Sequence, residues 1–186
     1  MRSNSEPLIN LPFPTNEQCD VPRIYLQQEG SFQGTWIDAI NASEMQQNIE
    51  YIQASVNGSV KISSFQRFHS VEFLMTPEMP IPFIAQVGKG IVKYGKPFCV
   101  YFSFYEHRQE PEILKNFGED YRGCFDRTED FIKEILTQEA FDSQLKRNNL
   151  SWKHLNIEEI IRDWFYSTEG IYRRMLDEKV YIFKRR

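Results

Sequence analysis

The stretch GSFQGTWIDAINASEMQQNIEYIQ, residues 30–53, contains the pattern that decides how the N-terminal part of the chain folds. Its first half holds the β-branched and aromatic run GTWIDA, which is typical of a short strand. Asn41 or Ser43 can then cap a helix over about residues 43–53, where apolar side chains recur at helical spacing. The stretch contains no histidine and no cysteine. It therefore predicts a scaffold in which a strand runs into a helix, and it offers no catalytic group.

Two further strands are expected on either side of this scaffold. The run PRIYLQ, residues 22–27, precedes it, and Gly30 suits the turn of a hairpin between PRIYLQ and GTWIDA. The run SVKISSFQRF, residues 59–68, follows the helix and has the apolar positions of a third strand. Residues 22–76 are thus predicted to form a ββαβ unit, a small sheet with one helix on its face. Residues 1–21 are proline-rich and aperiodic, and we expect them to form an extended arm.

A cluster of prolines marks the next boundary, because TPEMPIP places three prolines within six positions and disfavours a helix there. The pattern beyond this junction is mainly helical. Helices are expected over residues 82–95, near residues 112–117, and after a cap at Asp126 or Thr128. The run PFCVYFSFYE, residues 97–106, fits either a strand or a buried helix. Residues 77–142 are therefore predicted to form a central helical bundle.

The last part of the chain combines one helix with one hairpin. Asn156 can cap a helix over residues 157–165, whose apolar residues follow the i, i+3, i+4, i+7 rule. The runs GIYRRML and KVYIFKR then flank Asp177 and Glu178 as two strands. Residues 143–186 are thus predicted to form a C-terminal αβ unit. The fold class expected for the whole chain is α+β, built from three small units.

Composition narrows the function classes. The chain has 186 residues, of which 41% are hydrophobic and 15% aromatic, which is enough to bury cores. A net charge of −4, from 22 basic and 26 acidic side chains, favours neither nucleic acid nor an anionic membrane as a partner. Three cysteines without close spacing fit neither a disulfide framework nor a metal pair. No signal peptide or membrane-spanning run is visible, so we expect a soluble cytoplasmic protein.

The residues that could carry chemistry are dispersed. His69, His107 and His154 lie far apart and lack the spacing that places two imidazoles on one helix face. The GKG at residues 88–90 lacks the rest of a phosphate-binding loop, so its glycines are interpreted as helix or turn residues. Cys124 has no histidine near it in sequence and is interpreted as a partly buried thiol. We therefore expect no enzyme, no catalytic residue, no metal and no cofactor.

Charge placement is more informative than total charge. Residues 106–142 hold eleven acidic side chains against five basic ones. Asp130 and Glu134 lie four residues apart on one predicted helix, about 6 Å along its axis, which is close to the phosphate step of a nucleic-acid strand. Glu129 and Lys133 are placed to form a compensating ion pair. This acidic surface is either an ordinary solvated face or an imitation of phosphates.

Four stretches, in this order and spacing, give the chain a resemblance to a known family. They are RIYLQQEGSFQGTWIDA (23–39), IVKYGKPFCVYF (91–102), LKNFGEDYRGCFDRTEDFIKEIL (114–136) and LNIEEIIRDWFYSTEGIYRRMLDEKVYIFKR (155–185). Together they cover most of the chain after residue 22, and they resemble the antirestriction ArdA family. The resemblance implies an elongated molecule of three small units that dimerises through its C-terminal part.

The resemblance also implies a function without an active site. ArdA proteins, which are associated with mobile genetic elements, imitate bent B-form DNA and occupy the DNA-binding groove of type I restriction-modification enzymes. The expected partner is such an enzyme, and a homodimer with no direct binding of nucleic acid and no membrane contact is expected. The candidate phosphate mimics are Asp38, Glu44, Glu112, Glu119, Asp120, Asp126, Glu129, Asp130 and Glu134.

The chain departs from its relatives in one strand, and this leaves two alternatives. Relatives carry a strand like DYEGF, where this chain has SFQRF, with Ser64, Gln66 and Arg67 in place of acidic residues. The acidic surface is therefore expected to centre on residues 106–142. One alternative is an interaction or regulatory protein of the same fold that has lost the mimicry. The other is nucleic-acid binding through the basic C-terminal hairpin, by Arg173, Arg174, Lys184, Arg185 and Arg186.

Overall fold

The chain is a mixture of helices and two small sheets, so its class is α+β. The computed structural model describes residues 20–56, 58–103, 111–138, 141–166 and 171–184. Contacts divide the chain into two compact units, 1–116 and 117–186, which we call unit 1 and unit 2. This division falls inside the segment expected to be one central helical unit. The expected N-terminal arm lies almost entirely outside the described residues.

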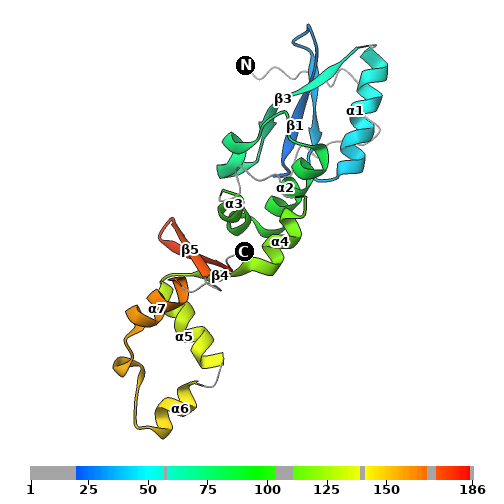
Figure 1. Cartoon of the computed structure of the whole chain (residues 1–186). Coiled ribbons are helices and arrows are strands. Elements are labelled where there is room, and N and C mark those ends of the chain that lie inside the picture. The colour runs from blue at the N-terminus through cyan, green and yellow to red at the C-terminus, as the bar shows by residue number, and fades with distance from the viewer. Residues whose placement is uncertain (1–19, 57, 104–110, 139–140, 167–170, 185–186) are drawn as a thin grey trace. The chain divides into compact units, whose positions relative to one another are not determined.

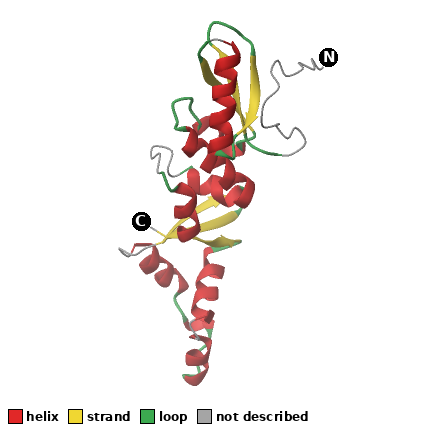
Figure 2. Ribbon diagram, turned by 90° about the vertical axis from the view of Figure 1, so that its right-hand side faces the viewer, coloured by secondary structure: helices red, strands yellow, loops and turns green. Residues whose placement is uncertain are grey.

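Unit 1 begins with the predicted ββαβ order (Figure 1). Strands β1 (Arg23–Gln28), β2 (Gly34–Asp38) and β3 (Val60–Gln66) form an antiparallel sheet in the order β2-β1-β3. β1 and β2 pair as a hairpin, as predicted, with Tyr25 opposite Trp36. Helix α1 (Ala42–Val56) packs against β2 and β3 (Figure 2).

Asn41, rather than Ser43, caps α1. Its Oδ1 accepts hydrogen bonds from the backbone N–H groups of Ser43 at 3.1 Å and Glu44 at 3.4 Å. Its Nδ2 donates to Glu44 Oε1 at 2.9 Å. The helix therefore begins one residue earlier than the sequence pattern suggested, because an asparagine satisfies N–H groups that would otherwise have no partner.

The other elements of unit 1, within the residues that the structure describes, are helices. They are the 3₁₀ helix η1 (His69–Leu74), α2 (Ile81–Tyr94), α3 (Lys96–Phe102) and the start of α4 (Ile113–Asp120). The run that fitted either a strand or a buried helix forms α3. Its five consecutive residues from Phe98 to Phe102 are all buried, which hides the amphipathic period from the sequence.

Gly88 and Gly90 lie inside α2, as interpreted, but they do more than weaken the helix. A Cβ at Gly88 would overlap the carbonyl oxygen of Ala39, and a Cβ at Gly90 would overlap the ring of Phe98. These two glycines therefore allow α2 to approach the end of the β1–β2 hairpin on one side and α3 on the other.

Unit 2 contains the second sheet. Its elements are β4 (Tyr121–Phe125), α5 (Thr128–Gln138), α6 (Phe141–Arg147), the 3₁₀ helix η2 (Trp152–His154), α7 (Ile157–Tyr166), β5 (Ile171–Leu176) and β6 (Lys179–Lys184). The predicted terminal hairpin is confirmed, and Asp177 and Glu178 form its turn with φ angles of 49° and 62°. Both pairings are antiparallel, in the order β4-β6-β5.

β4 corrects the prediction that residues 77–142 form a helical bundle, because it is a strand within that range. The burial of its residues alternates, with Arg122 and Cys124 exposed and their neighbours half-buried, which is the pattern of a strand. β4 pairs with β6, and this third strand matters because an isolated two-stranded hairpin is marginal in water. The β4–β6 register shifts between Tyr121 and Gly123, and Gly123 has a φ of +143°.

The core of unit 2 lies on both faces of β6. Val180 and Ile182 are buried with residues of α5 and partly buried residues of α7. On the alternate positions Tyr181 and Phe183 are buried, and the Phe183 ring lies 5.6 Å from that of Tyr121. Burial is the main cause that raises the pKa of Tyr181, and Cys124 beside it adds to the effect. The central strand thus fixes the positions of both β4 and α5.

Among the described residues, no helix has the length and apolar character that a membrane span requires.

Candidate partner-binding surface

Helix α5 presents the two acidic side chains that the sequence placed on one face. Phe131, Ile132 and Leu136 are buried in the core of unit 2, so this side of the helix is fixed. Asp130 and Glu134 lie on the opposite side, with Glu134 exposed and Asp130 half-buried. Among the described residues, neither carboxylate has an ion-pair or hydrogen-bond partner. We call these two side chains the acidic stripe of α5.

Asp126 lies just before α5 and forms an ion pair with Lys179. Lys179 is the first residue of β6, so the pair joins two segments that are 53 residues apart in the chain. The hydrogen bond with Asp126, and the charge of that carboxylate, raise the pKa of Lys179 above its usual value. Both side chains are well exposed, at 74% for Asp126 and 50% for Lys179. Because water screens the charges of an exposed pair, this pair contributes little to stability.

Glu129 pairs with a different cation from the one expected. Its Oε2 lies 3.5 Å from Nε of Arg127, and within the described ranges it makes no ion pair with Lys133. Arg127 comes immediately before the first turn of α5, so its long side chain reaches Glu129 without crossing the helix face. The expected pairing rested on helical spacing alone and did not include the residues before the helix.

The candidates in and before α4 are of mixed character. Glu112 is exposed and lies 3.1 Å from Nζ of Lys115. Glu119 is also exposed. Asp120 is only 2% exposed, because it is the last residue of α4 and is followed directly by β4, so it cannot present a charge to a partner. Asp120 is therefore removed from the candidate surface.

The two N-terminal candidates contribute to local structure. Asp38 lies opposite Arg23 in the β1–β2 register, and its Oδ1 is 3.5 Å from Nε of that arginine. The Arg23 side chain is 8% exposed, so this pair lies largely inside unit 1. Glu44 accepts the hydrogen bond from the cap residue Asn41. Of the nine candidates, only four lie near one another in the chain, on α5 or just before it. They are Asp126, Glu129, Asp130 and Glu134.

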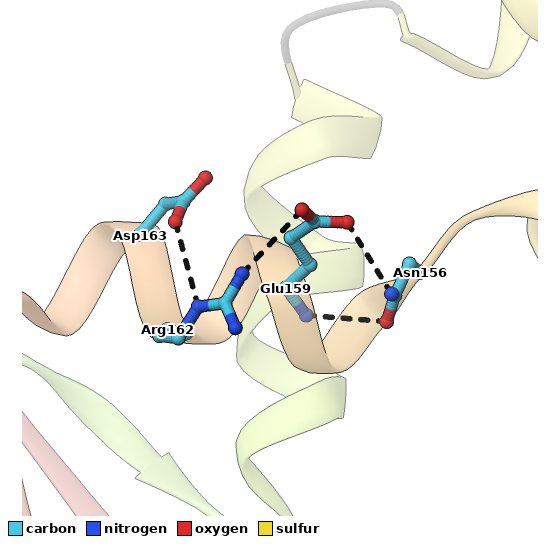
Figure 3. A network of polar contacts seen from close by, with 4 residues as sticks. All are labelled: Asn156, Glu159, Arg162 and Asp163. Carbon is cyan, nitrogen blue, oxygen red and sulfur yellow. Dashed lines mark hydrogen bonds and ion pairs between the residues drawn. The ribbon is translucent and has the colours of Figure 1, made fainter.

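A second group of polar side chains, on α7, was missed by sequence reasoning. Asn156 Oδ1 accepts a hydrogen bond from the backbone N–H of Glu159 at 3.2 Å, so the predicted cap is confirmed. Arg162 then lies between two carboxylates, with Nη2 3.4 Å from Glu159 and Nε 3.9 Å from Asp163 (Figure 3). The spacing of Glu159 and Arg162 by three residues was the available signal. Because one guanidinium serves both acids, this surface is partly neutralised.

The histidine and cysteine side chains differ in their surroundings, in hydrogen bonding and in burial. His154 accepts a hydrogen bond at Nδ1 from the backbone N–H of Ser151, 2.9 Å away. Burial is the main cause that raises the pKa of Cys99 and keeps its thiol neutral. Cys124 is exposed on β4, which corrects the expectation of a partly buried thiol; the side chains of a short edge strand alternate between faces. No group of three or more possible metal ligands is found among the described residues.

The basic C-terminal hairpin is only partly described. Lys184 is exposed at the end of β6, whereas the side chains of Arg173 and Arg174, and the whole of Arg185 and Arg186, lie outside the described residues. His107 and Cys19 lie outside them as well.

The chain was compared with models of protein families, with curated proteins and with solved structures, and none of the three comparisons finds a match.

Proposed function

We propose that the protein is an ArdA-like antirestriction protein that occupies the DNA-binding groove of a type I restriction-modification enzyme and blocks restriction. The sequence support is the ordered set of four stretches that resemble this family. The structural support is the acidic stripe of α5, where Asp130 and Glu134 stand on a helix that three buried side chains hold in place. The dimer formed through the C-terminal part of the chain belongs to the same proposal.

The physical basis of the proposal is competition for a cationic groove. Duplex DNA carries one negative charge per about 1.7 Å, and proteins that bind it line their grooves with lysine and arginine. A carboxylate pair about 6 Å apart on a helix matches the spacing of neighbouring phosphates on one strand. Because the buried side of α5 holds the helix backbone in place, binding costs the stripe little backbone freedom.

The test compares two double variants of equal charge. Asp130→Asn with Glu134→Gln removes the stripe while keeping the shape of each side chain. Glu158→Gln with Glu178→Gln removes two exposed acids of unit 2 that lie outside the stripe. DNA cleavage by purified type I enzymes is measured with increasing inhibitor. We expect the stripe variant to need about tenfold or more inhibitor, since charged contacts in a desolvated groove are worth more than surface pairs, and the control to resemble the wild-type protein.

Three results would count against the proposal. The first is a wild-type protein that inhibits none of a panel of type I enzymes in cleavage assays or in phage plating. The second is equal loss in the two double variants, which would indicate a general charge effect. The third is a shift of labelled duplex by the protein alone, which would favour the C-terminal hairpin as a nucleic-acid contact.

A further inference from the structure

His154 closes the turn that leads from α6 toward α7. This turn, residues 151–155, contains the 3₁₀ helix η2, and we call it the His154 turn. The backbone N–H of Ser151 donates to Nδ1 of His154 at 2.9 Å. In the other direction, the backbone N–H of His154 donates to the carbonyl oxygen of Ser151, also at 2.9 Å. The two residues therefore hold each other at the two ends of η2.

A histidine stands here in a place that suits a glutamate or a glutamine. In a capping box, the third residue after the cap returns its side chain to the N–H of the cap residue, and Glu or Gln is the usual residue. His154 is the third residue after Ser151 and makes this contact. A carboxylate or amide oxygen accepts throughout the neutral pH range, whereas an imidazole nitrogen accepts only while it carries no proton. The histidine therefore makes the contact depend on pH.

The contact at 2.9 Å requires one protonation state of the ring. A backbone N–H can only donate, so Nδ1 of His154 carries a lone pair and the proton of the neutral ring is on Nε2. A histidinium has an N–H on both nitrogens and would place two donors face to face. The Ser151 hydroxyl lies 3.2 Å from the same Nδ1 and can rotate to accept its proton. Protonation therefore moves the ring's hydrogen bond to the hydroxyl and leaves the backbone N–H of Ser151 without this acceptor.

Trp152 connects the His154 turn to α6. Its indole Nε1–H donates to Oδ1 of Asp142 at 2.6 Å, and its ring centre lies 6.2 Å from that of Phe141. Both aromatic side chains pack against the core of unit 2. Because Trp152 directly follows Ser151, a change in the hydrogen bond of the Ser151 N–H reaches α6 through this indole.

Charged side chains of both signs lie on the elements that adjoin the His154 turn. Asp142 on α6 holds the indole of Trp152. The others within the described residues are Lys146 and Arg147 at the end of α6, Lys153 in η2, and Glu158 and Glu159 in the first turn of α7. Positive and negative charges are equal in number there. The direction of the pH effect is therefore set by the hydrogen bond itself.

We infer that the His154 turn is a proton-sensitive switch, closed around the neutral ring and loosened in mild acid. Histidine is the side chain that ordinarily changes its charge between about pH 5 and 8. Because closure requires a ring without a proton on Nδ1, the turn is fully closed at the alkaline end of this range and opens as the pH falls through it. The inference rests on these hydrogen bonds and is independent of the proposed function.

NMR of the ¹⁵N-labelled wild-type protein tests the inference without any variant. The signals of the Ser151 amide and the Trp152 indole are followed from about pH 8 to about pH 5.5, above the range in which carboxylates ordinarily titrate. We expect both signals to move along one titration curve. Protection of the Ser151 amide against hydrogen exchange, corrected for the pH dependence of the intrinsic rate, should fall about fivefold, as on loss of a helix cap. A Ser151 signal that stays in place, or unchanged protection, would overturn the inference.

His154→Gln separates the ring from other effects of pH, because glutamine keeps an acceptor in the same place and is not protonated in this range. Its Ser151 and Trp152 signals should stay near their positions at pH 8. His69→Gln is the matched control, since His69 is an exposed histidine of η1 in unit 1, and it should titrate as the wild-type protein does. Thermal unfolding at pH 8 checks that both variants are folded. A response like that of the wild-type protein in His154→Gln would contradict the role of the ring.

Discussion

Gly88 of α2 lies directly against the carbonyl oxygen of Ala39, the residue that follows β2. This contact joins the helical part of unit 1 to the end of its first hairpin. Ala39 is fully buried, and its backbone N–H donates to the carbonyl oxygen of Pro22 at 2.7 Å. The oxygen that meets Gly88 therefore belongs to backbone that is already held in place and has little room to move.

Replacing Gly88 by alanine should destabilise the protein. The added methyl group would overlap the Ala39 oxygen, and we expect the free energy of unfolding to fall by about 1–3 kcal/mol. Gly118→Ala is the matched control, because that glycine lies in α4 with no atom within 4 Å of an added Cβ. It should gain about 0.4–1 kcal/mol from the smaller freedom of the unfolded chain. Urea unfolding followed by circular dichroism measures both, and shifts in the same direction would contradict this account of the contact.

Removing the cap of α7 should cost more than breaking its ion pair. Asn156→Ala leaves the N–H of Glu159 without its side-chain acceptor, and a loss of about 1 kcal/mol is expected. Arg162→Gln removes an exposed pair with Glu159 and should cost less than about 0.5 kcal/mol. Chemical unfolding of the two variants gives the comparison. A larger loss for Arg162→Gln would mean that the network in Figure 3 contributes more to stability than exposed pairs usually do.

Glu44 should be dispensable for binding a partner. Its Oε1 accepts a hydrogen bond from Asn41, and Glu44→Gln retains an oxygen in that place. We therefore expect this variant to keep the fold and, under the proposed function, to inhibit a type I enzyme to the same extent as the wild-type protein. The assay is the DNA-cleavage titration proposed for the α5 variants. A loss similar to that of the double variant at Asp130 and Glu134 would return Glu44 to the candidate surface.

Cys99 should make the fold sensitive to alkaline pH. Burial raises the pKa of its thiol above the ordinary value of 9.0, so the folded state holds its proton more tightly than the unfolded state does. The resulting stability is fully present below pH 9.0 and is lost as the pH rises through the higher folded-state pKa. The free energy of unfolding should therefore fall above about pH 9, and Cys99→Ala should show a smaller fall.

Cys124→Ala is the comparison for this pH series, because it removes a thiol that is exposed rather than buried. Its curve shows how much of any change comes from losing a thiol as such. Burial also raises the pKa of Tyr121 and Tyr181 above the ordinary value of 10.0, at which unfolded tyrosines titrate, so the comparison is best made between about pH 8 and pH 9.5. Identical slopes for wild-type protein and Cys99→Ala would contradict the role given to burial of that thiol.

Local pattern was enough to predict several parts of the fold. The β1–β2 hairpin, α1, α7 and the terminal hairpin each carry their period and their cap or turn residues within one short stretch. β4 was different, because YRGCF lies between two helices and forms a strand by pairing with β6, more than fifty residues later. A strand that depends on a distant partner leaves little trace in its own sequence.

The candidate surface, like the fold, could be predicted from the sequence only in part. Helical spacing places Asp130 and Glu134 opposite the buried Phe131 and Ile132, so the acidic stripe could be predicted. The pairing of Asp126 with Lys179 could not, since it depends on where β6 begins relative to α5. The burial of Asp120 is likewise a tertiary effect, which a charged residue at the end of a helix does not reveal.

The shifted register of β4 has a consequence for how the protein behaves at high concentration. β4 is an outer strand of its sheet, and outer strands offer unpaired backbone groups to which other chains can add. Here the ladder is interrupted between Tyr121 and Gly123 within only five residues, so an incoming strand would find donors and acceptors out of step. The irregularity thus protects this edge against intermolecular sheet growth and amyloid-like aggregation.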